Sequence, residues 1–286
     1  MTQWYIFQNL TNQEVLDIQK ELLQIGNSNQ MNGLILLALE GCNGTVAGTP
    51  EAIETIRTYL QSIFSGIAFQ DWTSDVQPFK RFKVDVREEI VALKHEGISP
   101  KGNSKHLSPK EFHTMIENGT ATVLDTRNIY ETNIGTFKDA VIPPLKSFQE
   151  FPEYIQKSNI PKDKPVLMFC TSGIRCEKAS EEMAHQGYQE VYQLDGGVTN
   201  YLKEYPNGYW NGECFMFDHR VAVDSNLQPS KRYSLCPRCG NPGDVATTCT
   251  ICKTDCTLCE ECLAKAPATC SRQCKNDLAL RIKQGV

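Results

Sequence analysis

Cysteine spacing constrains this chain more than any other feature of its sequence. Nine of its 13 cysteines lie between Cys236 and Cys274, and most of them form short-spaced pairs. Two such pairs supply the four thiolates of a tetrahedral zinc site. In a reducing compartment, clustered cysteines are more typical of metal binding or catalysis than of disulfides. Residues 236–286 are therefore predicted to form a separate zinc-binding module with two ions. The pairs are CPRC (236, 239), CTIC (249, 252), CEEC (259, 262) and CSRQC (270, 274).

The ninth cysteine of this module leaves the ligand set open. Cys249, Cys252 and Cys256 compete for two positions, so spacing does not say which thiol stays free. The ions are expected to be structural, because a site made of four cysteines leaves no open coordination position for a substrate. In addition, a short module with few apolar residues needs metal binding to stabilise its fold. A redox-active or disulfide-bonded tail is the competing interpretation. The candidate ligands are eight of Cys236, Cys239, Cys249, Cys252, Cys256, Cys259, Cys262, Cys270 and Cys274.

The remaining sequence is long enough for two further domains. The chain has 286 residues, of which 40% are hydrophobic and 22% charged, an ordinary globular composition. Its first residues, MTQWYIFQNL, lack the pattern of a signal peptide, and the apolar run 33–41 is far shorter than the roughly 20 residues of a membrane span. A soluble, cytoplasmic protein with no membrane partner is expected.

Charge is unevenly distributed along the chain. The net charge of −5 speaks against nucleic acid, yet residues 80–110 carry eight Lys/Arg against four Asp/Glu, and residues 228–286 carry nine against five. Basic segments on an acidic body can form a local phosphate-binding face. The simpler interpretation is that these charges are solvated surface.

Residues 1–95 have the pattern of a small α+β domain. Thr49 is a suitable N-cap and Pro50 suits the first position of a helix. The β-α-β-β-α-β order predicts a ferredoxin-like fold. Residues 96–105, rich in Gly and Ser, have the composition of a linker. The expected elements are strands at 4–10 and 33–40, a turn at 41–44 (GCNG), helices at 12–25 and 49–63, and further strand within 79–93.

Residues 106–210 alternate helix and strand, which predicts a parallel α/β domain with helices on both faces of its sheet. Ligands bind such sheets at the carboxyl ends of the strands. Cys170 follows the apolar run PVLMF (165–169) at such an end, directly before a predicted helix. The position favours a functional site. Residues 211–235 connect this domain to the cysteine module.

The loop CTSGIRC (170–176) has the chemistry of a reactive thiolate. Backbone N–H groups at a helix N-terminus, together with Arg175, are expected to lower the pKa of Cys170 from about 8.5 to between about 3.5 and 7.5. A buried cysteine that merely ends a core strand is the alternative. Cysteine-dependent phosphatases have one more residue between cysteine and arginine, so this smaller loop suits a single sulfur, held as a persulfide on Cys170.

Cys176 admits two interpretations. Across the tight loop it could approach Cys170 and resolve a persulfide or sulfenate as a disulfide. Equally, it could be a small residue that packs the first turn of the helix.

Residues 106–208 resemble the rhodanese-like sulfurtransferases throughout. The segment LDTRNIYETNIGTFKDA (124–140) is similar to that family's first motif, and LDGGVTNY (194–201) to its closing motif. Thr136 and Phe137 stand where a histidine is usual, which indicates a subfamily. The motif residues matched in the first segment are Asp125, Arg127, Glu131 and Gly135.

A more specific resemblance covers residues 1 to about 225. In this order, EGCNGTVAG, PFKRFKVDVREEIVALK, CTSGIRCEKAS and WNGECFMFDHRVAV resemble the rhodanese-related tRNA uridine hydroxylases, although Cys42 stands where isoleucine is usual. The resemblance implies oxygen-dependent conversion of uridine-34 to 5-hydroxyuridine in the anticodon region of tRNA. It also implies that Cys170 is the active-site cysteine and that Arg175 stabilises its anion.

The basic stretch gains interest from this resemblance. Lys80, Arg81, Lys83 and Arg87 are candidate phosphate contacts, and Phe79 and Phe82 candidate stacking platforms for an unpaired base. The alternative is that both phenylalanines are core residues rimmed by charge, which we favour for Phe82.

No short sequence motif explains how the protein would activate O2. Hydroxylation with O2 ordinarily needs iron, copper or flavin. The sequence has no flavin or nucleotide fingerprint, and its five histidines form no H-x-D/E pattern. Two other functions stay open: sulfur transfer from a persulfide donor to a small-molecule or tRNA acceptor, and a non-enzymatic RNA-binding adaptor. Besides tRNA, a sulfur donor or reductant protein is an expected partner.

Overall fold

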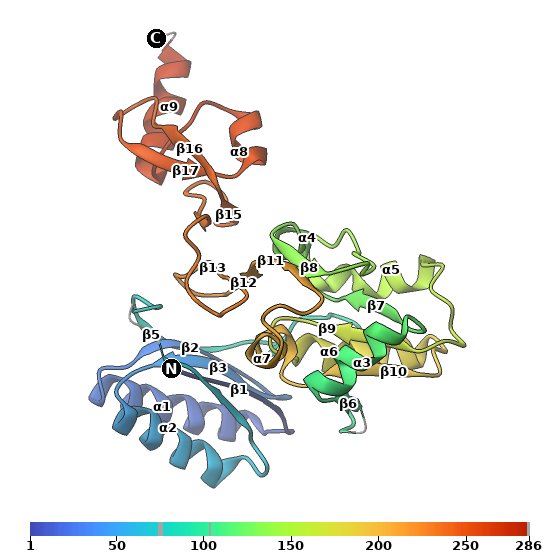
Figure 1. The fold of residues 1–286 in the computed structure, drawn as a ribbon. Helices are drawn as coiled ribbons and strands as arrows, with labels where there is room; N and C mark the ends of the chain where they lie inside the picture. The colour runs from blue at the N-terminus through green and yellow to red at the C-terminus, as the bar shows by residue number, and fades with distance from the viewer. Residues whose placement is uncertain (74–76, 103, 285–286) are drawn as a thin grey trace.

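The computed structural model describes residues 1–73, 77–102 and 104–284 and has three parts in chain order (Figure 1). The first is a five-stranded sheet of order β4-β1-β3-β2-β5, with both helices packed on one face. Its first four strands have the ferredoxin-like order, so that prediction is confirmed. The elements are β1 (Thr2–Phe7), α1 (Asn12–Ser28), β2 (Asn32–Ala38), β3 (Gly41–Ala47), α2 (Pro50–Ile63), β4 (Phe69–Asp71) and β5 (Phe82–Val86).

One local prediction in this domain is wrong. The sequence GCNG is not a turn: it begins strand β3, and the reversal after β2 falls on Leu39 and Glu40. The further strand expected within 79–93 is present as β5, but it is an additional edge strand parallel to β2; the fourth ferredoxin-like strand is β4, which pairs with β1. β4 has only three residues, too few to show an alternating pattern.

The N-terminal sheet has one covered and one open face. Side chains such as Trp4, Ile35 and Cys42 point toward α1 and α2 and form a buried core. The alternate residues point the other way because side chains of a strand alternate between faces. The open face, defined by these residues, is Gln3, Tyr5, Leu34, Leu36, Asn43 and Thr45.

The second part is a parallel sheet of order β6-β10-β9-β7 with helices on both faces, as predicted. One buried cluster joins α5 and α6 to the sheet, and another joins α3 and α7. β6 begins at Lys105, the last residue of the predicted linker. The elements are β6 (Lys105–Leu107), α3 (Pro109–Asn118), β7 (Thr122–Asp125), α4 (Ile129–Thr132), β8 (Gly135–Phe137), a 3-10 turn (Phe148–Glu150), α5 (Phe151–Lys157), β9 (Val166–Phe169), α6 (Ile174–His185), β10 (Val191–Leu194) and α7 (Gly197–Glu204).

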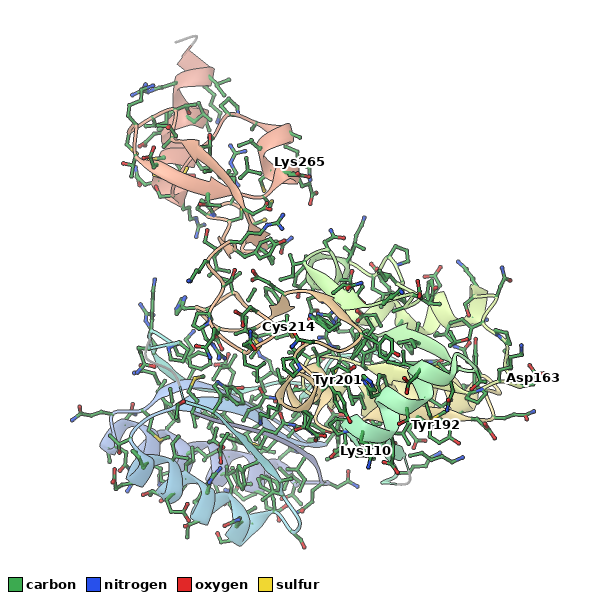
Figure 2. The ribbon with its side chains drawn as sticks, in the orientation of Figure 1. Lys110, Asp163, Tyr192, Tyr201, Cys214 and Lys265 are labelled. Carbon is green, nitrogen blue, oxygen red and sulfur yellow. The ribbon has the colours of Figure 1, made fainter. Side chains whose placement is uncertain are left out.

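The chain then returns to the second domain before it enters the cysteine module. β11 pairs with β8, and Figure 2 shows Tyr201 and Cys214 among densely packed side chains, while Lys265 lies on the module that stands apart. The elements are β11 (Trp210–Gly212), β12 (Cys214–Phe215), β13 (Ala222–Val223), β14 (Ser234–Leu235), β15 (Pro242–Gly243), β16 (Val245–Thr248), β17 (Asp255–Leu258), α8 (Glu260–Lys265) and α9 (Arg272–Gln284).

Helix α6 connects the first two domains. Tyr5 donates a hydrogen bond to Glu177 at 3.1 Å, and the buried ammonium of Lys178 lies 2.7 Å from Glu40. Lys178 also pairs with Glu89. These contacts hold the open face against the end of the parallel sheet where Cys170 lies. None of the helices in the described residues has the length and apolar character needed to cross a bilayer.

Candidate functional site

The Cys170 loop folds around its own sulfur. Cys170 directly follows β9, and the backbone N–H of Gly173 donates to its Sγ at 3.0 Å. Gly173 has a φ of 103°, a conformation that favours glycine. A Cβ at this position would also lie only 2.9 Å from the hydroxyl oxygen of Tyr5. Glycine therefore permits both the turn and the close approach of the N-terminal sheet.

The environment of Cys170 favours the thiolate. Burial by itself would raise the pKa of this thiol. The interaction with Cys176, the positive charge of Arg175 and backbone N–H groups of the loop outweigh burial and lower the pKa to about 6. Cys170 is thus mostly ionised at neutral pH, the protonation state that a sulfur nucleophile needs.

Arg175 acts on the sulfur from a fixed position. Its guanidinium donates two hydrogen bonds to Glu131, at 2.6 and 2.7 Å, and both side chains are buried. Such a fork holds the plane of the guanidinium. Arg175 does not hydrogen-bond the sulfur through its side chain in the described structure; its effect on Cys170 is through charge and its backbone N–H.

The other residues of the rhodanese-like motif are hydrogen-bonded to one another. Arg127 donates to both carboxylate oxygens of Asp125, at 3.0 and 2.8 Å, and to the carbonyl of Gly135 at 2.6 Å. Thr136, which stands where a histidine is usual, donates to Asp125 at 2.8 Å. These motif residues thus form a buried polar network.

Cys176 lies in the first turn of α6, fully buried beside Cys170. Burial, together with the interaction with the ionised Cys170, raises its pKa well above the usual value. Thr126 Oγ1 lies 3.7 Å from its sulfur. The two cysteines therefore form a pair in which Cys170 carries the charge and Cys176 keeps the proton.

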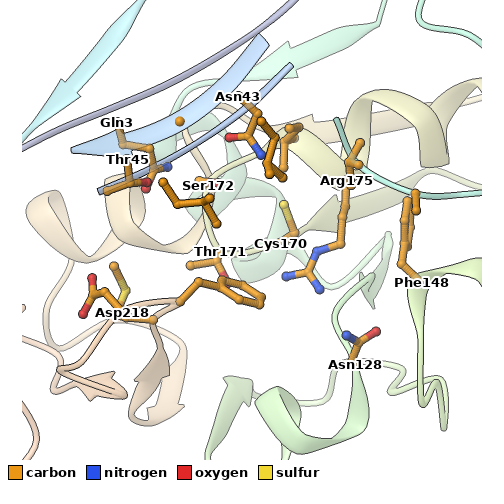
Figure 3. Close-up of a pocket in the computed structure, with 18 of the residues that line it drawn as sticks. Gln3, Asn43, Thr45, Asn128, Phe148, Cys170, Thr171, Ser172, Arg175 and Asp218 are labelled. Atoms are coloured by element: carbon orange, nitrogen blue, oxygen red, sulfur yellow. The ribbon is translucent and has the colours of Figure 1, made fainter. Parts of the chain in front are cut away.

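A cavity of about 350 Å³ lies between this loop and the open face of the N-terminal sheet. In Figure 3, Gln3, Asn43 and Thr45 reach in from the sheet, near Cys170 and Ser172 of the loop. Cys170 is only 1% exposed, so its surroundings limit access to the sulfur. The sequence indicates the loop and Phe79 but not the rest of the lining, which also includes Leu34, Leu36, Val91, Asn128, Phe148, Met216, Phe217 and Asp218.

Signals for two parts of this lining are present in the sequence. Asn43 and Thr45 alternate with core residues along β3, a pattern that the turn-like composition of GCNG obscures. Met216 and Phe217 belong to the segment WNGECFMFDHRVAV, which carries part of the family resemblance. Neither signal indicates by itself that the segments meet at Cys170.

Only some of the candidate RNA-binding residues lie near the cavity. Lys83 lies on β5 opposite Leu34, beside the open face, and Phe79 lines the cavity. Lys80 and Arg81 precede β5 and are exposed, while Arg87 is exposed and pairs with Asp85 at 2.9 Å. Phe82 packs onto Gly26 of α1 within the core, as favoured from the sequence.

The cysteine module contains two candidate metal sites of four cysteines each. In each, four sulfurs lie within 4.8 Å of one another. The pairs interleave, since the first pair joins the third and the second joins the fourth. Cys256 lies on β17 outside both groups. Four thiolates with no other donor suit zinc. The two groups are Cys236, Cys239, Cys259 and Cys262, and Cys249, Cys252, Cys270 and Cys274.

Three protein-family models match consecutive segments of the chain. Residues 1–90 match the UPF0176 acylphosphatase-like domain, residues 108–204 the rhodanese-like domain, and residues 211–275 the rhodanese C-terminal family. Among solved structures, the rhodanese-like domain of an Anabaena sp. protein is 18% identical and covers 38% of this chain and 80% of its own, with a TM-score of 0.32.

Curated relatives match most of the chain. A protein of Bdellovibrio bacteriovorus is 45% identical over 97% of this chain and 81% of its own length. A Picosynechococcus sp. protein is 42% identical over 79% and 78%, and a Teredinibacter turnerae protein 43% identical over 83% and 75%. All three are named tRNA uridine(34) hydroxylase.

Proposed function

Because this chain belongs to the tRNA uridine(34) hydroxylase family, we propose that it converts uridine-34 of tRNA to 5-hydroxyuridine, with O2 as co-substrate. The observation that carries the proposal is the position of Cys170: an ionised sulfur at the wall of a cavity large enough for a pyrimidine base. The 45% identity to a relative of this name over nearly the whole chain supports it.

The catalytic residues in this proposal are Cys170, Arg175 and Cys176. Cys170 carries a persulfide or a related sulfur species, and the charge of Arg175 stabilises its anion. Cys176 keeps a proton beside that sulfur. If Cys176 attacks the inner sulfur of a Cys170 persulfide, a Cys170–Cys176 disulfide forms and hydrosulfide leaves, which resets the site after a thiol reduces the disulfide.

The substrate reaches the site across the N-terminal domain. We propose that Lys80, Arg81, Lys83 and Arg87 contact phosphates of the anticodon region, since these exposed cations lie on or next to the edge strand beside the cavity. In this scheme residues 1–95 bind tRNA, residues 106–210 carry the chemistry, and the reaction takes place in the cytoplasm with a sulfur donor or reductant protein as partner.

The cysteine module holds two structural zinc ions in the proposal. The two interleaved thiolate groups would bind one ion each, and metal binding would supply the folding free energy that the small apolar core of this module lacks. No chemistry is assigned to these ions.

Sulfur transfer, the alternative suggested by the loop, is not favoured, because the relatives that match most of the chain are named for hydroxylation. One experiment separates the two. tRNA from a deletion strain, complemented with the wild type or with Cys170→Ser, is digested and its nucleosides are measured by mass spectrometry. Loss of 5-hydroxyuridine in the variant supports the proposal; loss of a thiolated uridine instead would refute it.

A further inference from the structure

The walls of the Cys170 cavity differ in chemistry. Part of its lining is apolar and includes Leu34, Phe79 and Phe148. The N-terminal sheet adds polar side chains to the lining: Gln3 lies opposite Thr45 in the strand register, and Asn43 is the next residue along β3 on the same face. An apolar slot with a few convergent polar groups is the usual form of a site for a small planar ligand.

Asn43 is oriented by the protein. Its Nδ2 donates to the backbone carbonyl of Ile90 at 3.4 Å. The carboxamide oxygen therefore points away from that carbonyl, and within the described residues it receives no hydrogen bond. Asn43 also neighbours Tyr5 in the register, the residue that contacts both the Cys170 loop and Glu177. Asn43 thus lines the cavity of Cys170 with an acceptor oxygen that no described residue engages.

Phe217 is a large aromatic ring left open at the same cavity. It is 61% exposed, yet it is held in place from two sides. The guanidinium carbon of Arg175 lies 5.6 Å from its ring centroid, and Phe215 meets it edge to face at 5.0 Å. Single exposed aromatics are common on proteins. This one lines the cavity of Cys170 and contacts the arginine of the loop, which gives it a place at the site.

Resting on the proposed function, we propose that Asn43 and Phe217 select and hold the target base: Asn43 Oδ1 accepts the ring N3–H of uracil, and Phe217 stacks on its face. The pairing edge of uracil lies opposite its C5–C6 edge. A uracil read by Asn43 on the sheet therefore presents the carbon that is hydroxylated toward the Cys170 loop.

The same contact excludes cytosine. Cytosine has an unprotonated N3, so its lone pair would face the oxygen of Asn43 and leave a desolvated acceptor without a donor. The N-terminal domain, and not the sulfur-carrying loop, would then determine which base enters.

The test measures binding and modification together. Anticodon stem-loop RNAs with uridine or cytidine at position 34 are titrated onto the full chain carrying Cys170→Ser, which prevents turnover. We expect uridine to bind about tenfold more tightly. Asn43→Ala should bring the two affinities together. Phe217→Leu should weaken both by about fivefold to a hundredfold, and more than Phe217→Tyr, which keeps the ring.

Matched controls separate recognition from folding. Asn32→Ala alters another half-buried asparagine, two positions before Leu34 on the same face of β2 but outside the cavity, and should leave the uridine preference intact. Thermal unfolding of each variant identifies loss of fold, and the exposed Phe217 can be changed with little effect on the core.

The outcomes also separate this inference from the function it rests on. If cells with the wild type form no 5-hydroxyuridine at position 34, the proposed function fails and the inference falls with it. If they form it, and Asn43→Ala keeps the uridine preference or Phe217→Leu binds as tightly as Phe217→Tyr, only the inference is overturned.

Discussion

Arg175 and Glu131 form a buried, two-pronged ion pair directly behind the reactive cysteine, with hydrogen bonds of 2.6 and 2.7 Å. The pair has two effects. It fixes the guanidinium, and it offsets part of the positive charge that acts on Cys170.

Glu131→Gln should therefore weaken the fold while making the thiol more acidic. The neutral amide leaves the buried Arg175 charge uncompensated, which should cost about 3–5 kcal/mol of unfolding free energy. With less negative charge nearby, the pKa of Cys170 should fall below the value of about 6 in the wild type. Urea unfolding and pH-dependent alkylation measure the two effects. Glu153→Gln, which removes an exposed partner of Lys157, should leave the unfolding curve nearly unchanged. Equal unfolding curves for both variants would contradict this account.

Alkylation of Cys170 should follow its low pKa. Because the thiolate is the reactive form, the rate with a small reagent should rise as pH increases through about 6 and level off above pH 7. Cys176→Ala removes an interaction that lowers this pKa and should shift the midpoint upward. Cys176→Ser keeps a donor at the same place and should shift it less. Peptide mass spectrometry isolates Cys170 from the other thiols; a wild-type midpoint near the ordinary thiol value of about 8.5 would disprove the thiolate assignment.

Reversal of the basic rim should reduce tRNA binding in a salt-dependent way. A triple variant, Lys80→Glu, Arg81→Glu and Lys83→Glu, removes cations expected to release counterions on binding. The slope of log K against log salt should flatten by about 0.7 for each phosphate that is no longer neutralised. Identical slopes for this variant and a matched control would exclude the rim from the interface. The control is a second triple variant, Lys20→Glu, Lys110→Glu and Lys164→Glu, at exposed positions away from the cavity.

Metal content should distinguish ligands from the spare cysteine. The wild type should contain about two zinc ions per chain, since two groups of four thiolates are present. Cys239→Ser should reduce this to about one and lower the stability of the module. Cys256→Ser, outside both groups, should keep both ions. Elemental analysis of the purified protein provides the count, and an equal fall in zinc content in the two variants would overturn the ligand assignment.

The sequence was sufficient where one local pattern determines the structure. The run PVLMF followed by CTSGIRC predicted a buried strand, a tight loop and a helix, and the structure has β9, the loop and α6 in that order. Thr49 and Pro50 likewise marked the start of α2, where Thr49 accepts from the N–H of Ala52. Caps and buried parallel strands depend on neighbours in sequence, so they can be recognised without the fold.

The sequence was insufficient where a site is formed by segments that are distant in the chain. Alternation on β3 shows that Asn43 and Cys42 face opposite ways, but not that the face with Asn43 covers Cys170. The spare cysteine could not be identified for the same reason. Cys249 lies in the same group of four sulfurs as Cys270 and Cys274, although the β16–β17 hairpin and a second cysteine pair separate them in the sequence. The spacing within each pair does not indicate which pairs meet.

The covering of Cys170 by a second domain has a consequence for the supply of electrons and sulfur. A sulfur that is 1% exposed at the wall of a cavity of about 350 Å³ can be reached only through that cavity. A tRNA base and the persulfide of a donor would have to occupy the same space beside Cys170. Loading of the sulfur and binding of the base would therefore take place in turn and not at the same time.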